Sequence, residues 1–180
     1  GSVRTWGTIL APGLGAGGRA IFALDITGPA SFSEANADDI SLWEFSSSTD
    51  ADLGLTMGEP VIAKMNDGSW AVIAGNGVNN TGSGQSGIFI LNAATGAVKR
   101  KIMTGLGSNS MPNGITNVTA VDLDGNMTVD VAYAGDLYGR MWKFDLTSTN
   151  PAGWSVAFSG SPLFHAEIEG DDQPITSAAE

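Results

Sequence analysis

The sequence contains no cysteine and a single histidine, His165, and these absences exclude two classes of site. Without thiols, the chain forms no disulfides and offers no thiolate to a metal ion. One imidazole also leaves too few nitrogen ligands for a transition-metal centre built within the chain. The lack of cysteine does not by itself assign a cellular compartment.

Basic residues are scarce as well, with 8 Lys and Arg against 19 Asp and Glu, for a net charge of −11. A nucleic-acid partner would require a basic face, so this class of function is excluded. An acidic surface instead suits solubility and the binding of cations. No apolar run reaches the length of about 20 residues that a membrane helix needs, and we recognise no signal peptide. We therefore expect neither a transmembrane segment nor a leader within this sequence.

Long helical patterns are missing, and short apolar segments separated by glycine-containing turns take their place. Three hairpins share one pattern, in which an apolar strand, a turn with glycine and a second strand ending in Asp or Asn follow one another. They span residues 6–13 with 18–25, 70–76 with 87–92, and 129–136 with 139–145. A further strand follows each hairpin, at 42–45, 98–102 and 155–158, and one precedes the second and third, at 60–65 and 118–121.

Four strands in each unit of about 50 residues are typical of a propeller blade. The fold class predicted is all-β, a β-propeller fragment of about three four-stranded antiparallel blades, similar to quinoprotein propellers. We assign residues 1–58 to an incomplete blade, 59–114 to a blade, 115–172 to a blade with a metal loop, and 173–180 to the first strand of a next blade. Pro60 and Pro174 suggest a repeat of 57 residues. Because an open arc exposes apolar blade faces, we also expect self-association through its open edges.

The segment from Asp122 to Asp130 carries the strongest chemical signal of the chain. Asp122, Asp124 and Asn126 stand at alternate positions of a tight loop, so their side-chain oxygens can surround one ion. Thr128 can add its backbone carbonyl, and Asp130 can close the ring. Because Ca²⁺ takes roughly 6–8 hard oxygen ligands, this pattern predicts a calcium site formed by Asp122, Asp124, Asn126, Thr128 and Asp130.

The loop departs from an EF-hand in three respects. Tyr133 stands where that motif has a bidentate glutamate, Met127 stands where glycine makes the sharp turn, and the flanking segments are strands. A polar hairpin turn without an ion is the alternative. The repeat favours a functional loop, because this turn has three more residues than the corresponding turn that follows Ala63.

A longer series of motifs resembles the C-terminal propeller of the PilC/PilY family of type IV pilus biogenesis factors. The series includes Gly13 to Arg19, Phe22 to Asp25, Leu42 to Phe45, Leu53 to Ala63, Asn66 to Ile73 and Ala132 to Leu146, and it covers essentially the whole chain. The resemblance implies a secreted protein at the cell surface, the outer membrane or the pilus. It also implies roles in pilus assembly, retraction and adhesion, with pilus components or a host-surface ligand as partners. The family's calcium loop falls on Asp122, Asp124, Asn126, Thr128 and Asp130, and its propeller is larger than this chain.

Two other functions remain open from the sequence. Ala93 to Gly96 and Gly139 to Asp145 look similar to blade signatures of quinoprotein dehydrogenases, although such signatures dock neighbouring blades and perform no chemistry. A passive scaffold for outer-membrane assembly is the third hypothesis, and it predicts indifference to calcium. The leading expectation is a non-catalytic, calcium-binding module.

Overall fold

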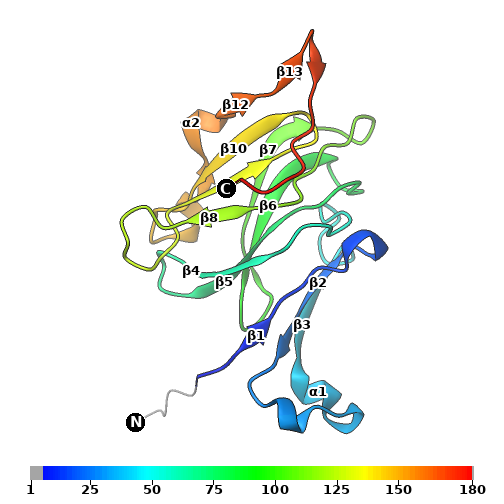
Figure 1. Ribbon diagram of the computed structural model, residues 1–180, viewed down its shortest axis with the longest axis vertical. Helices are drawn as coiled ribbons and strands as arrows, with labels where there is room; N and C mark the ends of the chain where they lie inside the picture. The colour runs from blue at the N-terminus through cyan, green and yellow to red at the C-terminus, as the bar shows by residue number, and fades with distance from the viewer. Residues whose placement is uncertain (1–5, 180) are drawn as a thin grey trace.

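The computed structural model describes residues 6–179 as antiparallel sheets that follow one another along an open arc (Figure 1). Three of these sheets are blades of a propeller, and blade two lies between blade one and blade three, since one apolar cluster joins it to each neighbour. The sheets do not close into a ring within this chain. Among residues 6–179, no helix has both the length and the apolar character that crossing a membrane would require.

The observed strands follow the predicted hairpins closely. Blade one has the order β1-β2-β3, formed by Ile9–Leu10, Ala20–Asp25 and Ser41–Ser46. Blade two has the order β4-β5-β6-β7, formed by Val61–Lys64, Trp70–Gly75, Gln85–Asn92 and Val98–Gly107. Blade three has the order β11-β10-β9-β8, formed by Ser155–Val156, Arg140–Asp145, Val131–Gly135 and Thr119–Val121. The prediction of an all-β propeller fragment is thereby confirmed.

The apolar runs of β5 and β6 have a simple cause, which is that blade two is covered on both faces. Ile73, Ile88 and Ile90 face blade three, whereas their neighbours Val72 and Phe89 face blade one. Successive strand residues point to opposite faces of a sheet, so a strand covered on both sides becomes apolar throughout. The edge strand β4 alternates between half-buried and exposed positions instead.

Short helical turns fill the connections. They are η1 (Gly15–Gly17), η2 (Pro29–Ser31), η3 (Glu34–Asn36), α1 (Ala37–Ile40), η4 (Pro151–Gly153) and α2 (Ala157–Gly160). In α2, Phe158 and Ser159 have left-handed backbone angles, with φ of 53° and 57°, so this segment is a pair of turns. These turns end β11 early, and the predicted strand at 155–158 is therefore only two residues long. A second short strand, β12 (Phe164–His165), then pairs with β10 further along.

Blade one docks on blade two through a tryptophan. The indole Nε1–H of Trp43 donates to the carbonyl oxygen of Ala93 at 2.9 Å. The Trp43 ring also covers Gly96, where an added Cβ would lie only 2.7 Å from a ring atom. The segment from Ala93 to Gly96 thus has a docking role between blades, the role that the sequence assigned to this signature.

The linkers that follow blades two and three are 60 residues apart in the structure, which corrects the alignment of Pro174 with Pro60. Ile115 packs against Gly75, mainly through its backbone, and Ile175 packs against Gly135, 60 residues further along the chain. Residues 173–178 therefore correspond to the linker around Ile115 and not to an opening strand, and the structure assigns no strand to 173–179. The amide of Ile175 donates to the carbonyl of Asp136 in blade three at 3.0 Å. The division of the chain at residues 58, 114 and 172 stays a prediction, and residues 1–5 and 180 lie outside the described part.

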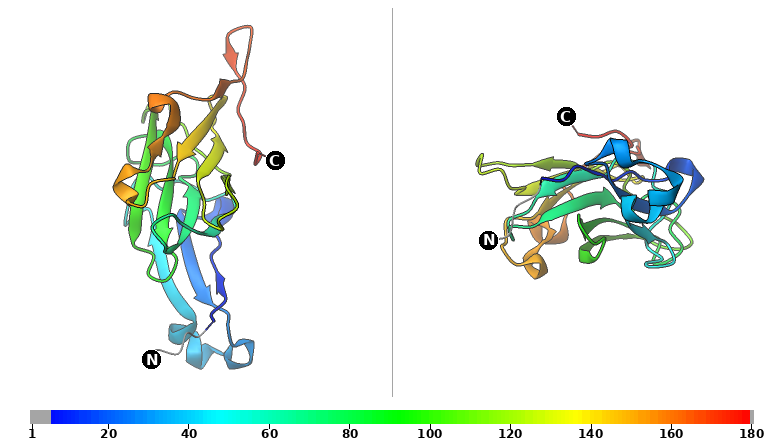
Figure 2. Two further views of the ribbon diagram at one scale, coloured as in Figure 1. Left: turned by 90° about the vertical axis from the view of Figure 1, so that its left-hand side faces the viewer. Right: turned by 90° about the horizontal axis from the view of Figure 1, so that it is seen from below.

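A two-stranded hairpin, β13 (Glu167–Ile168) with β14 (Asp171–Asp172), projects from the end of the molecule opposite blade one (Figure 2). His165 contacts both strands of this hairpin, since its Nε2 lies 2.7 Å from Asp172 Oδ1 and its Nδ1 lies 3.3 Å from Glu167 Oε2. The only histidine of the sequence is thus an edge residue that holds this hairpin in place.

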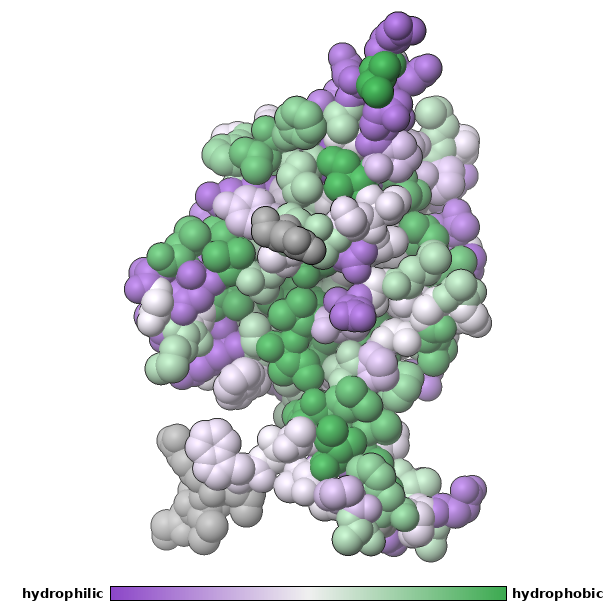
Figure 3. Space-filling model, in the orientation of Figure 1, coloured by the Kyte–Doolittle hydropathy of each residue, from purple (hydrophilic) through white to green (hydrophobic). Residues whose placement is uncertain are grey.

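Exposed apolar residues gather along the middle of one face and continue down over blade one (Figure 3). Leu10, Ile62 and Trp70 are among the large apolar side chains with substantial exposure. Ile62 and Trp70 line a hollow of about 550 Å³ together with Trp6, Gly7, Ile9, Asn92, Ala93 and Ala94. Open apolar surface of this kind is consistent with packing against further protein.

Candidate metal centre

The candidate loop connects β8 to β9 in blade three. Val121 and Val131 pair across its base, and the amide of Asp130 donates to the Val121 carbonyl at 3.0 Å. Two residues within the loop have left-handed backbone angles, Gly125 with φ of 77° and Met127 with φ of 68°. These angles fold the loop back on itself, so that its two ends and its middle come together.

Three of the five predicted ligands meet in the structure. Asp122, Asp124 and Asp130 each offer a carboxylate oxygen, and these oxygens lie within 4.8 Å of one another. Asp130 is buried, with 7% of its surface exposed, whereas Asp122 is half-buried and Asp124 is exposed. No ion pair with a lysine, arginine or histidine is found for any of them within residues 6–179. Like charges at this separation repel, and a divalent cation with oxygen ligands would compensate them.

Backbone amides hold the Asp122 carboxylate in place. Oδ2 accepts from the amide of Met127 at 2.7 Å, and Oδ1 accepts from the amides of Gly125 at 2.8 Å and Asn126 at 3.2 Å. Partial burial opposes ionisation, but these N–H groups outweigh it and lower the pKa of Asp122 below its ordinary value. The carboxylate is therefore held in its ionised, metal-binding form.

Asp130 is fixed from two sides. Its Oδ2 accepts from the amide of Leu123 at 2.8 Å, within the loop. Its Oδ1 accepts from the side-chain amide of Asn66 at 3.2 Å, and Asn66 belongs to blade two. A carboxylate with both oxygens engaged in this way is oriented before any ion binds.

Asn126 and Thr128 lie in the same loop but are held differently. The Nδ2 of Asn126 donates to Asp124 Oδ2 at 3.0 Å, so this residue borders the carboxylate cluster. The hydroxyl of Thr128 lies 2.9 Å from Asn66 Oδ1 of blade two, and it also contacts Asn126 Oδ1 within the loop, which accepts from the Thr128 amide at 2.8 Å. This orientation is compatible with the backbone carbonyl of Thr128 as the ligand. The complete set of five ligands stays a prediction.

Met127 is the residue that the sequence marked as unusual, and the structure gives the reason. Its side chain is 82% exposed and its φ is positive, which costs roughly 1–2 kcal/mol for a residue with a Cβ. We expect Met127→Gly to stabilise the chain by about 0.5–1 kcal/mol, because the relieved strain exceeds the entropy that glycine adds to the unfolded state. Thermal unfolding without added metal measures this. Met127→Ala is the control, since it removes the same side chain but keeps the Cβ, and an equal gain from both variants would contradict the explanation.

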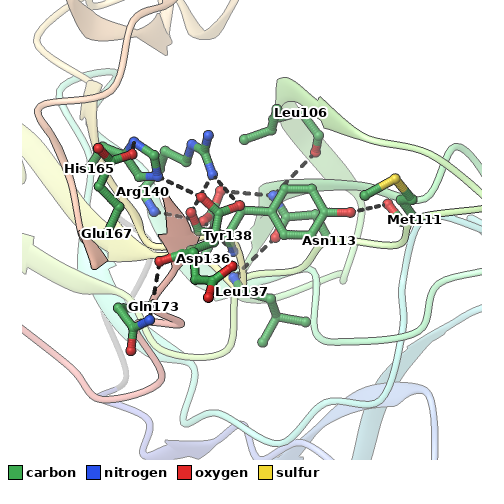
Figure 4. A network of polar contacts seen from close by, with 12 residues as sticks. Leu106, Met111, Asn113, Asp136, Leu137, Tyr138, Arg140, His165, Glu167 and Gln173 are labelled. Atoms are coloured by element: carbon green, nitrogen blue, oxygen red, sulfur yellow. Dashed lines mark hydrogen bonds and ion pairs between the residues drawn. The ribbon is translucent and has the colours of Figure 1, made fainter. Parts of the chain in front are cut away.

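Asp136 forms the centre of a second polar cluster, which the sequence analysis did not single out. This carboxylate is fully buried after β9. Oδ2 accepts from Asn113 Nδ2 and Trp142 Nε1, both at 2.8 Å, and Oδ1 accepts from the amides of Tyr138 and Arg140, both at 2.9 Å. Figure 4 shows how Asn113 and Tyr138 extend the network to the carbonyls of Leu106 and Met111. All of its polar atoms are satisfied within the protein, so this cluster is structural.

Gly13, Gly15 and Gly18 have the spacing of a dinucleotide-binding motif, but in the structure they belong to a tight turn. The short η1 turn and then strand β2 follow Gly13, where a dinucleotide site would need a helix.

Asn66 is the residue of the candidate centre that sequence reasoning missed. It lies 64 residues before Asp130, and no local spacing connects the two.

Comparisons with known proteins agree with this geometry. The family model described as the PilY1 beta-propeller domain matches residues 2–180. A type IV pilus biogenesis factor PilY1 homolog of Xylella fastidiosa is 42% identical and is aligned with 98% of this chain but only 13% of its own length. A type IV pilus biogenesis factor PilY1 of Pseudomonas aeruginosa is 36% identical, over 96% of this chain and 16% of its own length.

A solved structure is also similar. The crystal structure of the Pseudomonas aeruginosa PilY1 C-terminal domain superposes with a TM-score of 0.85 at 34% sequence identity. The alignment covers 96% of this chain and 37% of that one. These relatives are described as pilus biogenesis factors, and none of their names denotes an enzyme.

Proposed function

The chain belongs to the PilY1 β-propeller domain family, and from this premise we propose that it is a calcium-binding, non-catalytic module of a type IV pilus biogenesis and adhesion factor. In this proposal the module regulates the extension and retraction of the pilus. Its setting is the cell surface, the outer membrane or the pilus itself, and its partners are pilus components or a host-surface ligand. The chain spans 13% and 16% of two of its curated relatives, so the activity of the whole protein belongs to this proposal.

The observation that carries the proposal is the convergence of Asp122, Asp124 and Asp130 without a basic partner among the described residues. Three carboxylates, an asparagine oxygen and a backbone carbonyl form a hard, anionic ligand set that matches Ca²⁺. Mg²⁺ fits less well, because it requires a strict octahedral geometry and retains several of its waters.

The bound ion would supply charge compensation. Asp122 is held by loop amides and Asp130 by Leu123 and Asn66, so these residues provide a preformed part of the site. Asp124 is exposed, and its carboxylate accepts from the backbone and side-chain amides of Asn126 within the loop. Binding would therefore mainly order the Asp124 side of the loop and fix the surface beside blade three. The apolar packing between blades two and three, in which Met65 and Val129 are buried, would remain in place without the ion.

Asp124→Ala tests the proposal most cleanly, because the residue is exposed and the hydrogen bonds of its side chain come from Asn126 in the same loop. We expect one-site Ca²⁺ binding by the wild-type chain after treatment with a chelator and no measurable binding by the variant, using titration calorimetry with Mg²⁺ as a control. A site of about 10⁻⁴ M would stabilise the wild type by about 1.4 kcal/mol at millimolar Ca²⁺. The unfolding midpoint would rise by roughly 3–6 °C.

The choice of aspartate matters for this test. Asp130→Ala would leave the amide of Leu123 without its acceptor and would remove one of the three acceptors of Asn66 Nδ2, so a loss of binding there would be mixed with a loss of stability. Wild-type protein that binds no Ca²⁺ would contradict the proposal and would favour the passive assembly scaffold. Saturable binding that survives Asp124→Ala would place the ion elsewhere.

A further inference from the structure

Asn66 reaches from blade two into the candidate metal loop of blade three. It lies in the turn between β4 and β5, and its side chain uses both ends on the neighbouring blade. Nδ2 lies 2.9 Å from the Val129 carbonyl, 3.2 Å from Asp130 Oδ1 and 3.2 Å from the Leu146 carbonyl. Oδ1 lies 2.9 Å from the Thr128 hydroxyl. One side chain of blade two thus contacts two of the five predicted ligand residues.

The main chain joins the same two blades at the same place. The amide of Val129 donates to the Lys64 carbonyl at 2.9 Å, and Met65 forms a parallel bridge with Val129. Met65 and Val129 are both buried in the cluster that joins blades two and three. The C-terminal side of the metal loop is therefore also part of the interface between these blades.

We propose that Asn66 is a positioning residue through which metal occupancy of the loop is coupled to the packing of blade two against blade three. The inference rests on the proposed function, because it requires that the loop binds Ca²⁺. An ion held by Asp130 and Thr128 restrains the two groups that Asn66 contacts, and it therefore stabilises the inter-blade contact. Coupling of this kind is reciprocal, so the inter-blade contact must equally strengthen the binding of the ion.

The first test compares Ca²⁺ affinity in the wild-type chain, Asn66→Ala and Asn92→Ala by titration calorimetry. Partners that orient metal ligands typically contribute 10–100-fold in affinity, so we expect Asn66→Ala to weaken binding by at least about tenfold. Asn92 is the matched control, since it also belongs to blade two, where it ends β6, and its side-chain oxygen accepts from the amides of Ala94 and Thr95. Asn92→Ala is expected to leave the affinity unchanged.

The second test measures hydrogen exchange of the Val129 amide, which donates across the interface to Lys64. In the wild type, we expect Ca²⁺ to slow this exchange together with that of the loop amides of Gly125 and Met127. In Asn66→Ala, saturating Ca²⁺ should protect the loop amides but leave the Val129 amide nearly unchanged. A merely structural role for Asn66 would alter exchange equally with and without the ion.

The outcomes separate the two proposals. Wild-type protein that binds no Ca²⁺ overturns the proposed function, and this inference with it. The coupling alone is overturned if the wild type binds Ca²⁺, Asn66→Ala binds it with the affinity of the wild type, and Ca²⁺ slows exchange of the Val129 amide in Asn66→Ala as much as in the wild type. Should Asn66→Ala fail to fold, Thr128→Val provides a second comparison, because it removes the hydroxyl that contacts Asn66 and keeps the predicted carbonyl ligand. The same hydroxyl also contacts Asn126 Oδ1, so exchange of the Val129 amide, and not the affinity, is the readout for this variant.

Discussion

Asp136→Asn is expected to destabilise the chain by about 3–5 kcal/mol, although the two side chains have nearly the same shape. Each carboxylate oxygen of Asp136 accepts from two close donors, at 2.8 Å for Oδ2 and 2.9 Å for Oδ1, and the Ser86 hydroxyl lies a further 3.5 Å from Oδ2. An asparagine must place its –NH₂ group against one of these pairs, so two buried donors lose their acceptor in either orientation. Each orphaned buried donor costs about 1–3 kcal/mol. Thermal unfolding should show a midpoint lower by roughly 6–20 °C.

Rearrangement of the neighbours does not rescue this variant. The amide of Asn113 cannot turn over, because its Oδ1 already accepts from the amides of Gly114 and Leu137. Asp171→Asn is the control, since Asp171 is exposed on β14, and it should change the midpoint very little. Equal stability of Asp136→Asn and the wild type would mean that Asp136 is not the ionised acceptor described here.

The equivalent position in blade two shows the opposite chemistry. Asn76 follows β5 as Asp136 follows β9, and it is also fully buried. Its Nδ2 donates to the carbonyls of Asp52 and Gln85, while its Oδ1 accepts from the amides of Gly87 and Ile115. An aspartate here would face two carbonyl oxygens. One position of the repeat thus requires an amide in blade two and a carboxylate in blade three.

Gly75→Ala is the second substitution with a large expected effect. A Cβ at Gly75 would lie 2.3 Å from the Ile115 carbonyl oxygen and 2.7 Å from its carbonyl carbon. These are main-chain atoms of the linker that enters blade three, and the Ile115 carbonyl also accepts from the amide of Gly77 at 2.7 Å. Because no side chain can turn away to relieve the clash, the linker must shift and lose this bond. We expect a loss of about 3 kcal/mol or more, at the upper end of the cost of overpacking.

Gly17→Ala is the matched control for this prediction. Gly17 has no heavy atom within 4 Å of the position of a Cβ, and its φ lies outside the left-handed region. Chemical denaturation of both variants should therefore show a large loss for Gly75→Ala and almost none for Gly17→Ala. A small effect at both positions would mean that the linker can move away from β5 without cost.

Much of the fold follows from local patterns in the sequence. The apolar runs and their turns predicted nearly every strand of blades two and three, since alternation and turn chemistry act over a few residues. The strand predictions fail where the backbone turns sharply or where a segment pairs with no neighbouring strand. Phe158 and Ser159 end β11 early through left-handed angles, and the 57-residue step aligned Pro174 with the wrong part of the blade.

By itself, the sequence determined the class of fold, the repeat of hairpins and the loop that gathers Asp122, Asp124 and Asp130, because all of these depend on residues close together in the chain. Only the tertiary structure decided which polar atoms meet across the blades. The contact of Asn66 with Asp130 and the difference between Asn76 and Asp136 depend on how distant segments pack. Hydrogen-bond partners are set within fractions of an ångström, and no periodicity in the sequence specifies a distance between blades.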